Sequence, residues 1–163
     1  MALTKKKLEA LFRLTFAEAR KGVRLAHGGP FGAAVIDRKG KVLSLAHNTV
    51  LRDNDPSCHA EVNAIRAAAK KMKRPHLEGC IVIASSEPCP MCLTTSYWAN
   101  VAGIVYAVPK EVAASVGFDD SFIYEELEKP PSARRIGVEH FEAVSREGEA
   151  VFREWKERDG KLY

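Results

Sequence analysis

The sequence lacks any apolar run long enough to cross a membrane. Of its 163 residues 46% are hydrophobic, yet no stretch approaches the roughly 18 consecutive apolar residues of a transmembrane helix. The amino-terminal segment MALTKKKLEALFRL becomes amphipathic after its lysines and offers no small-residue cleavage site, unlike a secretory signal. These absences exclude a protein anchored by a transmembrane helix, and we expect a cytoplasmic location.

Internal repeats, low-complexity segments and strong charge are also missing. The net charge is only +4, and the basic residues gather only at 5–7 and 70–74, which does not indicate a nucleic-acid footprint. Cysteine is scarce, with four residues at positions 58, 80, 89 and 92. Without a secretory signal, metal binding or a structural role is favoured over disulfides.

The apolar residues alternate between helical and strand spacing along the chain. This pattern predicts a three-layer α/β domain around a mixed sheet, in which the last two buried strands and the helix between them form a parallel βαβ unit. A turn at Lys39-Gly40 joins the first two strands. The predicted helices cover 5–26, 59–71 and 90–99, and the predicted strands 32–38, 41–47, 80–86 and 102–108.

Two short motifs about thirty residues apart carry groups that bind metals. Cys89 and Cys92 form a C-x-x-C at the start of a predicted helix, where two thiolates one turn apart can face a single ion and the helix amino terminus lowers their pKa. His59, at the start of the other helix, supplies a third ligand. Three protein ligands leave a fourth position open, which is the arrangement of a catalytic zinc site.

Glu61 lies two residues beyond His59, close enough to reach water at the open position without binding the ion. Its expected role is that of general acid and base, whereas Cys58 is expected only to fill space. Taken alone, the C-x-x-C also fits a redox pair or half of a structural zinc site, and H-x-E is common by chance. Together and in this order, the motifs match the zinc deaminase signature H-x-E…P-C-x-x-C.

The segments around these motifs resemble the zinc-dependent cytidine and nucleobase deaminase superfamily, and within it the bacterial guanine deaminases. The resemblance runs nearly end to end, and GFDDSFIYEEL separates the guanine branch from the others. It implies a cytidine deaminase-like fold with a central mixed sheet of about five strands flanked by helices. The segments that carry it are HAEVNAI, SSEPCPMCLTTSYWA, GGPFGAAVI, HNTV, DNDPSCHAE and GFDDSFIYEELEKP.

The resemblance implies an aminohydrolase that converts guanine to xanthine and ammonia in purine catabolism or salvage. It assigns one zinc ion per subunit to His59, Cys89 and Cys92, and the proton shuttle to Glu61. The implied mechanism is attack of activated water on C2 of the base, with Glu61 protonating the ring nitrogen and the leaving amine.

The resemblance also implies a set of substrate-binding residues. Asn48 matches the asparagine that hydrogen-bonds the bound base. Asp120 matches the acidic residue that recognises the guanine edge and helps to protonate it, so it counts as catalytic too. Phe31 and Trp98 are at positions of pocket walls, and Tyr163 matches a carboxy-terminal tyrosine that closes over the site.

Other readings of these residues stay open. Asp120 also suits a helix cap within Asp119–Ser121, because a carboxylate there accepts from the first free amides. His47, next to Asn48, is more typical of a surface or capping residue. The hydroxyl-rich segment 93–96 departs from the small apolar residues common in the family, which leaves room for activity on cytosine or triazines.

Three alternative functions compete with guanine deamination. A transfer-RNA adenosine deaminase shares the zinc motifs, but the acidic residues within 119–128 oppose binding of phosphate. A guanosine or other nucleoside deaminase needs only room for a ribose. A non-catalytic, zinc-stabilised binding protein has no need of the proton carrier Glu61.

The carboxy-terminal segment raises a question about assembly. Val151, Phe152 and Trp155 lie on one face of a predicted helix over 146–158, and such a stripe normally packs on a core. In guanine deaminases this segment is exchanged between two subunits. With the hinge candidate Pro130-Pro131, we expect one domain over 1–163 and a homodimer in which 132–163 is swapped.

Overall fold

The computed structural model describes residues 3–163, and the chain divides after Asp120 into two units. Among the described residues, no helix is both long and apolar enough to traverse a bilayer. The first unit contains α1 (Lys5–Arg24), β1 (Gly32–Ile36), β2 (Val42–His47), α2 (Val50–Asp53), α3 (Ala60–Met72), β3 (Ile81–Ser86), α4 (Pro90–Trp98), β4 (Gly103–Val108) and α5 (Lys110–Ser115). These elements confirm every helix and strand predicted between residues 5 and 108, and add the single turn α2.

The sheet of the first unit is mixed and has the strand order β2-β1-β3-β4. Strand β1 pairs antiparallel with β2 and β3, and β3 pairs parallel with β4, as the βαβ prediction requires. The expectation of about five strands is wrong, since residues 3–163 form a sheet of four. The chain turns at Pro109 directly after β4 and continues as helix α5, and within residues 3–163 no fifth strand pairs with β4.

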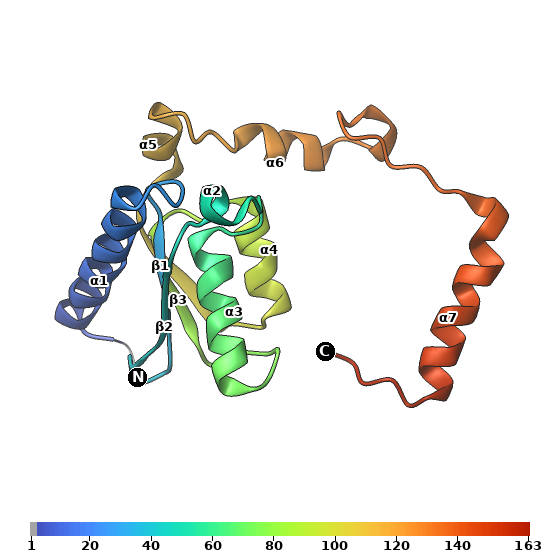
Figure 1. Cartoon of the computed structure of the whole chain (residues 1–163), viewed down its shortest axis with the longest axis horizontal. Helices are drawn as coiled ribbons and strands as arrows, with labels where there is room; N and C mark the ends of the chain where they lie inside the picture. The colour runs from blue at the N-terminus through green and yellow to red at the C-terminus, as the bar shows by residue number, and fades with distance from the viewer. Residues whose placement is uncertain (1–2) are drawn as a thin grey trace. The chain divides into compact units, whose positions relative to one another are not determined.

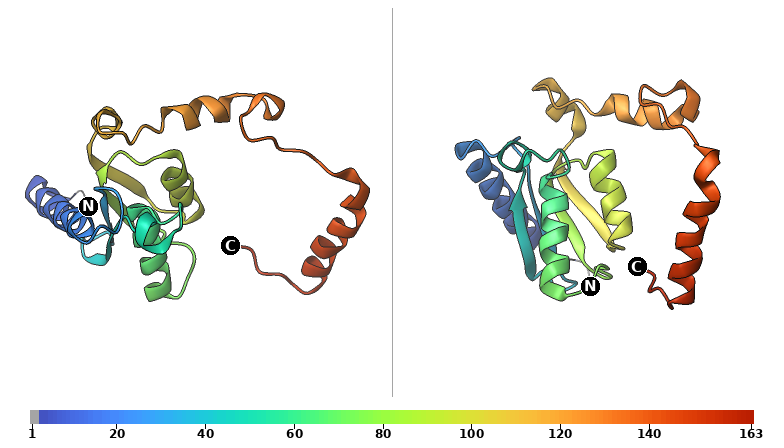
Figure 2. Two further views of the ribbon diagram at one scale, coloured as in Figure 1. Left: turned by 45° about the horizontal axis from the view of Figure 1, so that its top comes forward. Right: turned by 45° about the vertical axis from the view of Figure 1, so that its right-hand side comes forward.

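Helices cover both faces of this sheet, with α1 on one face and α3 and α4 on the other (Figures 1 and 2). Strand β1 is buried throughout, so its alternating side chains fill two separate clusters. Ala33 and Val35 pack with the apolar face of α3, whereas Ala34 and Ile36 pack with Leu11 of α1. The result is the three-layer α/β/α arrangement expected from the sequence.

Two glycines fit the chain into this arrangement. Gly40 has a φ of 75° in the turn between β1 and β2, a conformation that favours glycine. Asp37 closes the same turn, because its Oδ1 accepts from the backbone N–H groups of Lys39 and Lys41. A Cβ at Gly32 would collide with the carbonyl oxygen of Thr15, so glycine lets α1 lie directly against the start of β1.

The second unit, Ser121–Tyr163, consists of short helices without a core of its own. It contains α6 (Ser121–Glu128), the 3-10 turns Pro131–Ala133 and Glu142–Val144, and α7 (Ser145–Glu157). Glu126 ties α6 to the chain after the proline pair, accepting from the backbone N–H of Arg135 at 2.6 Å. No residue of 121–163 is buried, and the α7 residue Phe152 is 77% exposed.

Candidate active site

The three predicted metal ligands come from the starts of two helices. His59 is the N-cap residue of α3 and Cys89 is that of α4, both in extended backbone conformation. Neither side chain accepts a capping hydrogen bond from its helix, so both remain available to an ion. Pro90 occupies the first turn of α4, where proline lacks only an N–H that the helix would leave unpaired.

These ligand atoms converge at a spacing suited to zinc. The Nδ1 atom of His59 lies 3.5 Å from Sγ of Cys89 and 3.5 Å from Sγ of Cys92. A tetrahedral ion with Zn–S of about 2.3 Å and Zn–N of about 2.05 Å would separate nitrogen and sulfur by about 3.6 Å. Among the described residues, these three are the group of histidine, cysteine and acidic side chains that could hold a metal, and two thiolates with an imidazole suit zinc.

The two thiols differ in their protonation. A hydrogen bond from the Cys92 thiol lowers the pKa of Cys89 to about 4. The same hydrogen bond, reinforced by burial, raises the pKa of Cys92 far above its usual range. The pair without metal therefore holds one proton, and binding of an ion must release it, because the thiolate is the ligand form.

Glu61 lies in the first turn of α3 beside the ligands. Its side chain is buried, and its Oε2 accepts from the Cys92 thiol at 3.4 Å. Burial raises the pKa of the Glu61 carboxyl above its ordinary value, since a low-dielectric site penalises the charge. A carboxyl whose pKa moves toward neutrality can both take and return a proton, as general acid–base catalysis requires.

A cavity of about 660 Å³ opens over these groups, within the range of small-molecule sites. Six of the residues proposed from the sequence line it, whereas the ligand Cys92 lies buried outside the lining. The structure thus gathers residues from five separate segments at one place. The six are Phe31, Asn48, His59, Glu61, Cys89 and Asp120.

Asn48 presents a defined face to this cavity. Its Oδ1 accepts from the backbone N–H groups of Gly29 and Val50, each at 3.2 Å. Backbone N–H groups are donors only, so these contacts fix the oxygen of the carboxamide and leave its NH2 group as the donor for a ligand. A Cβ at Gly28 would collide with Asn48 Oδ1, which explains a glycine in HGGPFG.

Asp120 and the rings of Phe31 and Phe118 also line the cavity. Burial, and then the negative charge of Cys89, raise the pKa of the Asp120 carboxyl. Phe31 packs edge-on against Phe118, with ring centroids 5.0 Å apart. No pattern in the sequence predicts that Phe118 lines the cavity. The one indication is its place in GFDDSFIYEEL, immediately before the two aspartates.

The other two proposed substrate residues are not among the residues that line the cavity. Trp98 is the last residue of α4 and is 70% exposed. Tyr163 belongs to the second unit and is 78% exposed. Their roles in substrate binding stay predictions.

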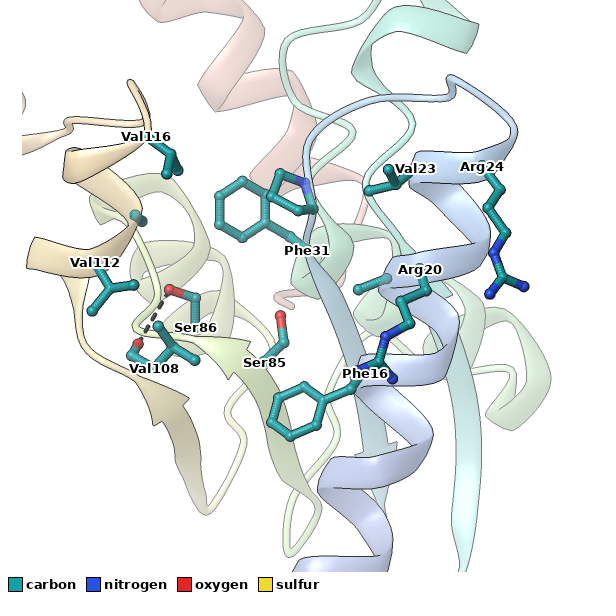
Figure 3. Close-up of a pocket in the computed structure, with 13 residues that line it drawn as sticks. Phe16, Arg20, Val23, Arg24, Phe31, Ser85, Ser86, Val108, Val112 and Val116 are labelled. Carbon is teal, nitrogen blue, oxygen red and sulfur yellow. Dashed lines mark hydrogen bonds between the residues drawn. The ribbon is translucent and has the colours of Figure 1, made fainter.

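A second, mainly apolar cavity of about 420 Å³ adjoins the first. Phe31 and Ser86 line both cavities, so these side chains stand at the boundary (Figure 3). The hydroxyl of Ser86 donates to the carbonyl oxygen of Val108 at 3.2 Å, which ties β3 to β4 at this point. Phe31 therefore borders both cavities.

The fold and this arrangement of ligands define a zinc-binding deaminase domain. Residues 5–108 match the family described as the cytidine and deoxycytidylate deaminase zinc-binding region, and the chain belongs to that family. It is an enzyme domain with one site for zinc per subunit, formed in this structure by a histidine and two cysteines.

Comparison with individual proteins shows which members of the family this chain is similar to. Guanine deaminase of Bacillus subtilis is 40% identical over 91% of this chain and 93% of its own. The X-ray structure of guanine deaminase from the same organism superposes with a TM-score of 0.88 at 39% identity, covering 95% of this chain and 97% of the other. A transfer-RNA-specific adenosine deaminase of Aquifex aeolicus is 29% identical over 69% of this chain and 71% of its own.

Proposed function

We propose that this chain catalyses the zinc-dependent hydrolysis of guanine to xanthine and ammonia. The observation that carries the proposal is one cavity that joins the His59, Cys89 and Cys92 ligand set and Glu61 to Asn48 and Asp120. The similarity to the guanine deaminase of Bacillus subtilis along nearly the whole chain supports the same substrate.

His59, Cys89 and Cys92 would hold the zinc ion. Bound there, zinc supplies a water activated for attack on carbon at neutral pH. Because all four cysteines among the described residues are unpaired, and the ligands must be reduced, we place the protein in the cytoplasm.

Glu61 performs the proton transfers in this proposal. Its carboxylate takes a proton from the water that attacks C2 and passes it to ring nitrogen N3. The carboxylate then takes the second proton of that water, from the hydroxyl now on C2, and passes it to the exocyclic amine, which leaves as ammonia as the C2=O bond forms. The raised pKa of Glu61 favours the proton uptake, because a carboxylate with a higher pKa is a stronger base.

Asn48 and Asp120 recognise the edges of the base. Guanine carries two adjacent donors, N1–H and the exocyclic amine, and a carboxylate at Asp120 can accept from them. The NH2 group of Asn48 donates to an acceptor atom of the ring, since its oxygen is already engaged by Gly29 and Val50. Phe31 offers an apolar wall for the flat ring.

The alternative with direct support is deamination of adenosine in transfer RNA, because an enzyme with that activity also matches this chain. The lining of the cavity argues against it. Asp119 and Asp120 both line the cavity, and two acidic residues there would repel the phosphates of a polynucleotide. The test of the substrate is ammonia release from guanine by the zinc-loaded protein, compared with guanosine, cytosine and adenine.

We also propose that the chain is one functional domain over 1–163 and acts as a homodimer that exchanges residues 132–163. The second unit exposes many large apolar side chains and buries none, so a partner surface would stabilise it. The most exposed of these side chains are Ile136, Phe141, Phe152, Leu162 and Tyr163.

The dimer is tested by replacing an apolar residue of α7. We expect light scattering to give the wild type twice the 18.0 kDa mass of one chain, and Phe152→Ser to shift the protein toward monomer. The control is Arg153→Ala on the same helix, which breaks only an exposed ion pair with Glu149. A wild type that stays monomeric at assay concentrations would rule out the exchange.

A further inference from the structure

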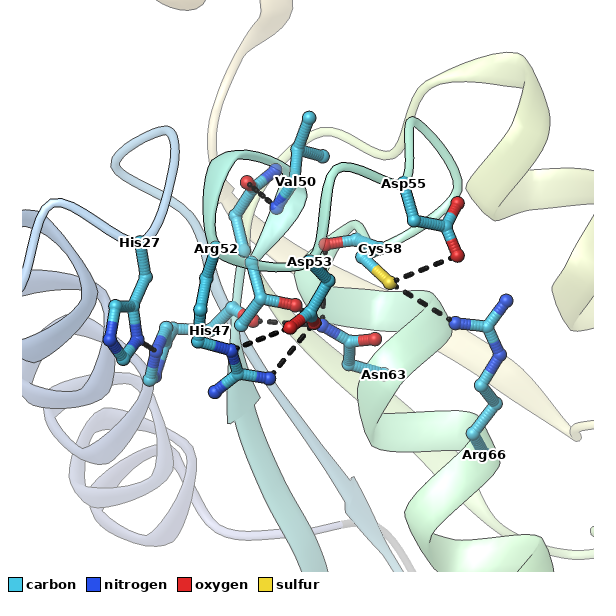
Figure 4. Close-up of polar contacts among 11 residues, drawn as sticks. His27, His47, Val50, Arg52, Asp53, Asp55, Cys58, Asn63 and Arg66 are labelled. Atoms are coloured by element: carbon cyan, nitrogen blue, oxygen red, sulfur yellow. Dashed lines mark hydrogen bonds and ion pairs between the residues drawn. The ribbon is translucent and has the colours of Figure 1, made fainter.

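Three titratable side chains, Glu18, His47 and His27, form a hydrogen-bonded series outside the lining of the cavity. Glu18 Oε1 of α1 lies 2.7 Å from His47 Nδ1 at the end of β2. His47 Nε2 lies 2.9 Å from His27 Nδ1, on the loop that leads into GGPFG (Figure 4). His47 is only 7% exposed, so of the two expected roles, surface or capping residue, the first is wrong.

The Glu18 carboxylate fixes one proton in this series. A carboxylate only accepts, so His47 donates its Nδ1–H to Glu18. The contact between His47 Nε2 and His27 Nδ1 is a second hydrogen bond, whose donor depends on the tautomers of the two rings. Burial, and then the positive charge of Arg52, lower the pKa of His27, which agrees with a neutral ring.

These bonds are part of a closed loop of contacts that includes Asn48. His47 is bonded directly to Asn48, the Asn48 Oδ1 accepts from Gly29 N–H, and Gly29 is two residues from His27. The hydrogen bond between His27 and His47 completes this loop of contacts. The Asn48 N–H also donates to the carbonyl oxygen of Phe31 at 3.0 Å. Loop 27–31 and the Asn48 carboxamide are therefore held as one unit.

A glycine inside α1 leaves room for the His47 side chain. Gly22 is buried in the last part of the helix, where glycine is less stable than alanine. A Cβ there would lie 2.7 Å from Cδ2 of the His47 ring. The His47 imidazole therefore occupies space that any larger residue at position 22 would take.

We propose that Glu18, His47 and His27 are positioning residues that orient the Asn48 carboxamide toward the substrate. The three do not reach the cavity, since none of them lines it. They act through the loop 27–31 and the backbone at the end of β2. This inference rests on the proposed guanine deaminase activity, in which Asn48 holds the base.

A double-mutant cycle tests the proposal, using the zinc-loaded full chain and guanine. We expect His27→Ala to raise KM about tenfold with kcat nearly unchanged, as for groups coupled in one hydrogen-bond network. In an Asn48→Ala background, the same change should raise KM by less than about twofold, because the group being positioned is gone. Glu18→Ala should behave like His27→Ala, and it replaces that variant if His27→Ala fails to fold by circular dichroism.

Glu9→Ala is the matched control, because Glu9 lies on the same helix and pairs only with the exposed Arg13. It should leave KM unchanged in both backgrounds. Equal increases of KM for His27→Ala with and without Asn48 would overturn the proposal, as would no increase in either. A wild type that turns over no guanine would refute the proposed function, and with it this role for Asn48; turnover with additive effects would refute the positioning alone.

Discussion

Replacing Glu61 by Gln should lower kcat for guanine by about 10³-fold, within the range measured for loss of a general acid–base group. Gln keeps the size and shape of the Glu61 side chain, so it should not displace the ligand Cys92, whose Sγ lies 3.4 Å from Oε2. It cannot take and return a proton. Metal analysis should therefore find the variant with as much zinc as the wild type, while ammonia release is nearly abolished.

Glu111→Gln is the control for this result. Glu111 occupies the first turn of α5 as Glu61 occupies the first turn of α3, but it is exposed. The control should keep wild-type kcat. Substantial guanine hydrolysis by zinc-loaded Glu61→Gln would show that another group carries the protons.

Loss of zinc should be as damaging as loss of Glu61. Without the ion, the pKa of the attacking water rises far above neutrality, and we expect activity to fall by at least about 10³-fold. Dialysis against a chelator should inactivate the wild type, and added zinc should restore it. Cys92→Ala should neither retain zinc nor recover, because it removes one of three ligands.

Cys58→Ala controls for general effects of removing a buried thiol. Cys58 precedes His59 and is buried like Cys92, yet its Sγ contacts Asp55 at 3.3 Å and Arg66 at 3.5 Å instead of the ligands. This variant should bind zinc and turn over substrate. Zinc loss from Cys58→Ala, or full activity of chelated wild type, would contradict the ligand assignment.

The metal ligands could be predicted from the sequence because local rules place them. The C-x-x-C spacing is one helical turn. Pro90 and the apolar periodicity mark the two helix starts at which Cys89 and His59 lie. Which face of the Asn48 carboxamide is free could not be predicted. It depends on backbone N–H groups of Gly29 and Val50, and the first of these lies nineteen residues away in the sequence.

The same limit applies to other parts of the fold. The contact between Phe31 and Phe118 joins segments far apart in the chain, and no periodic pattern records it. The turn α2 is only four residues long, which is too short to show helical spacing in the sequence. A lone histidine such as His47 is more typical of a surface or capping residue. Only the packing of α1 against β2 shows that His47 has Glu18 as a hydrogen-bond partner.

Ammonia release from guanine, guanosine, cytosine and adenine, measured in parallel on the zinc-loaded protein, tests the substrate most directly. We expect guanine to be turned over fastest, with xanthine as the product, because Asp120 and the NH2 group of Asn48 match its adjacent donors and its ring acceptor. Faster turnover of guanosine would contradict a free base as the substrate. Activity on cytosine alone would contradict the role of Asp120 as well.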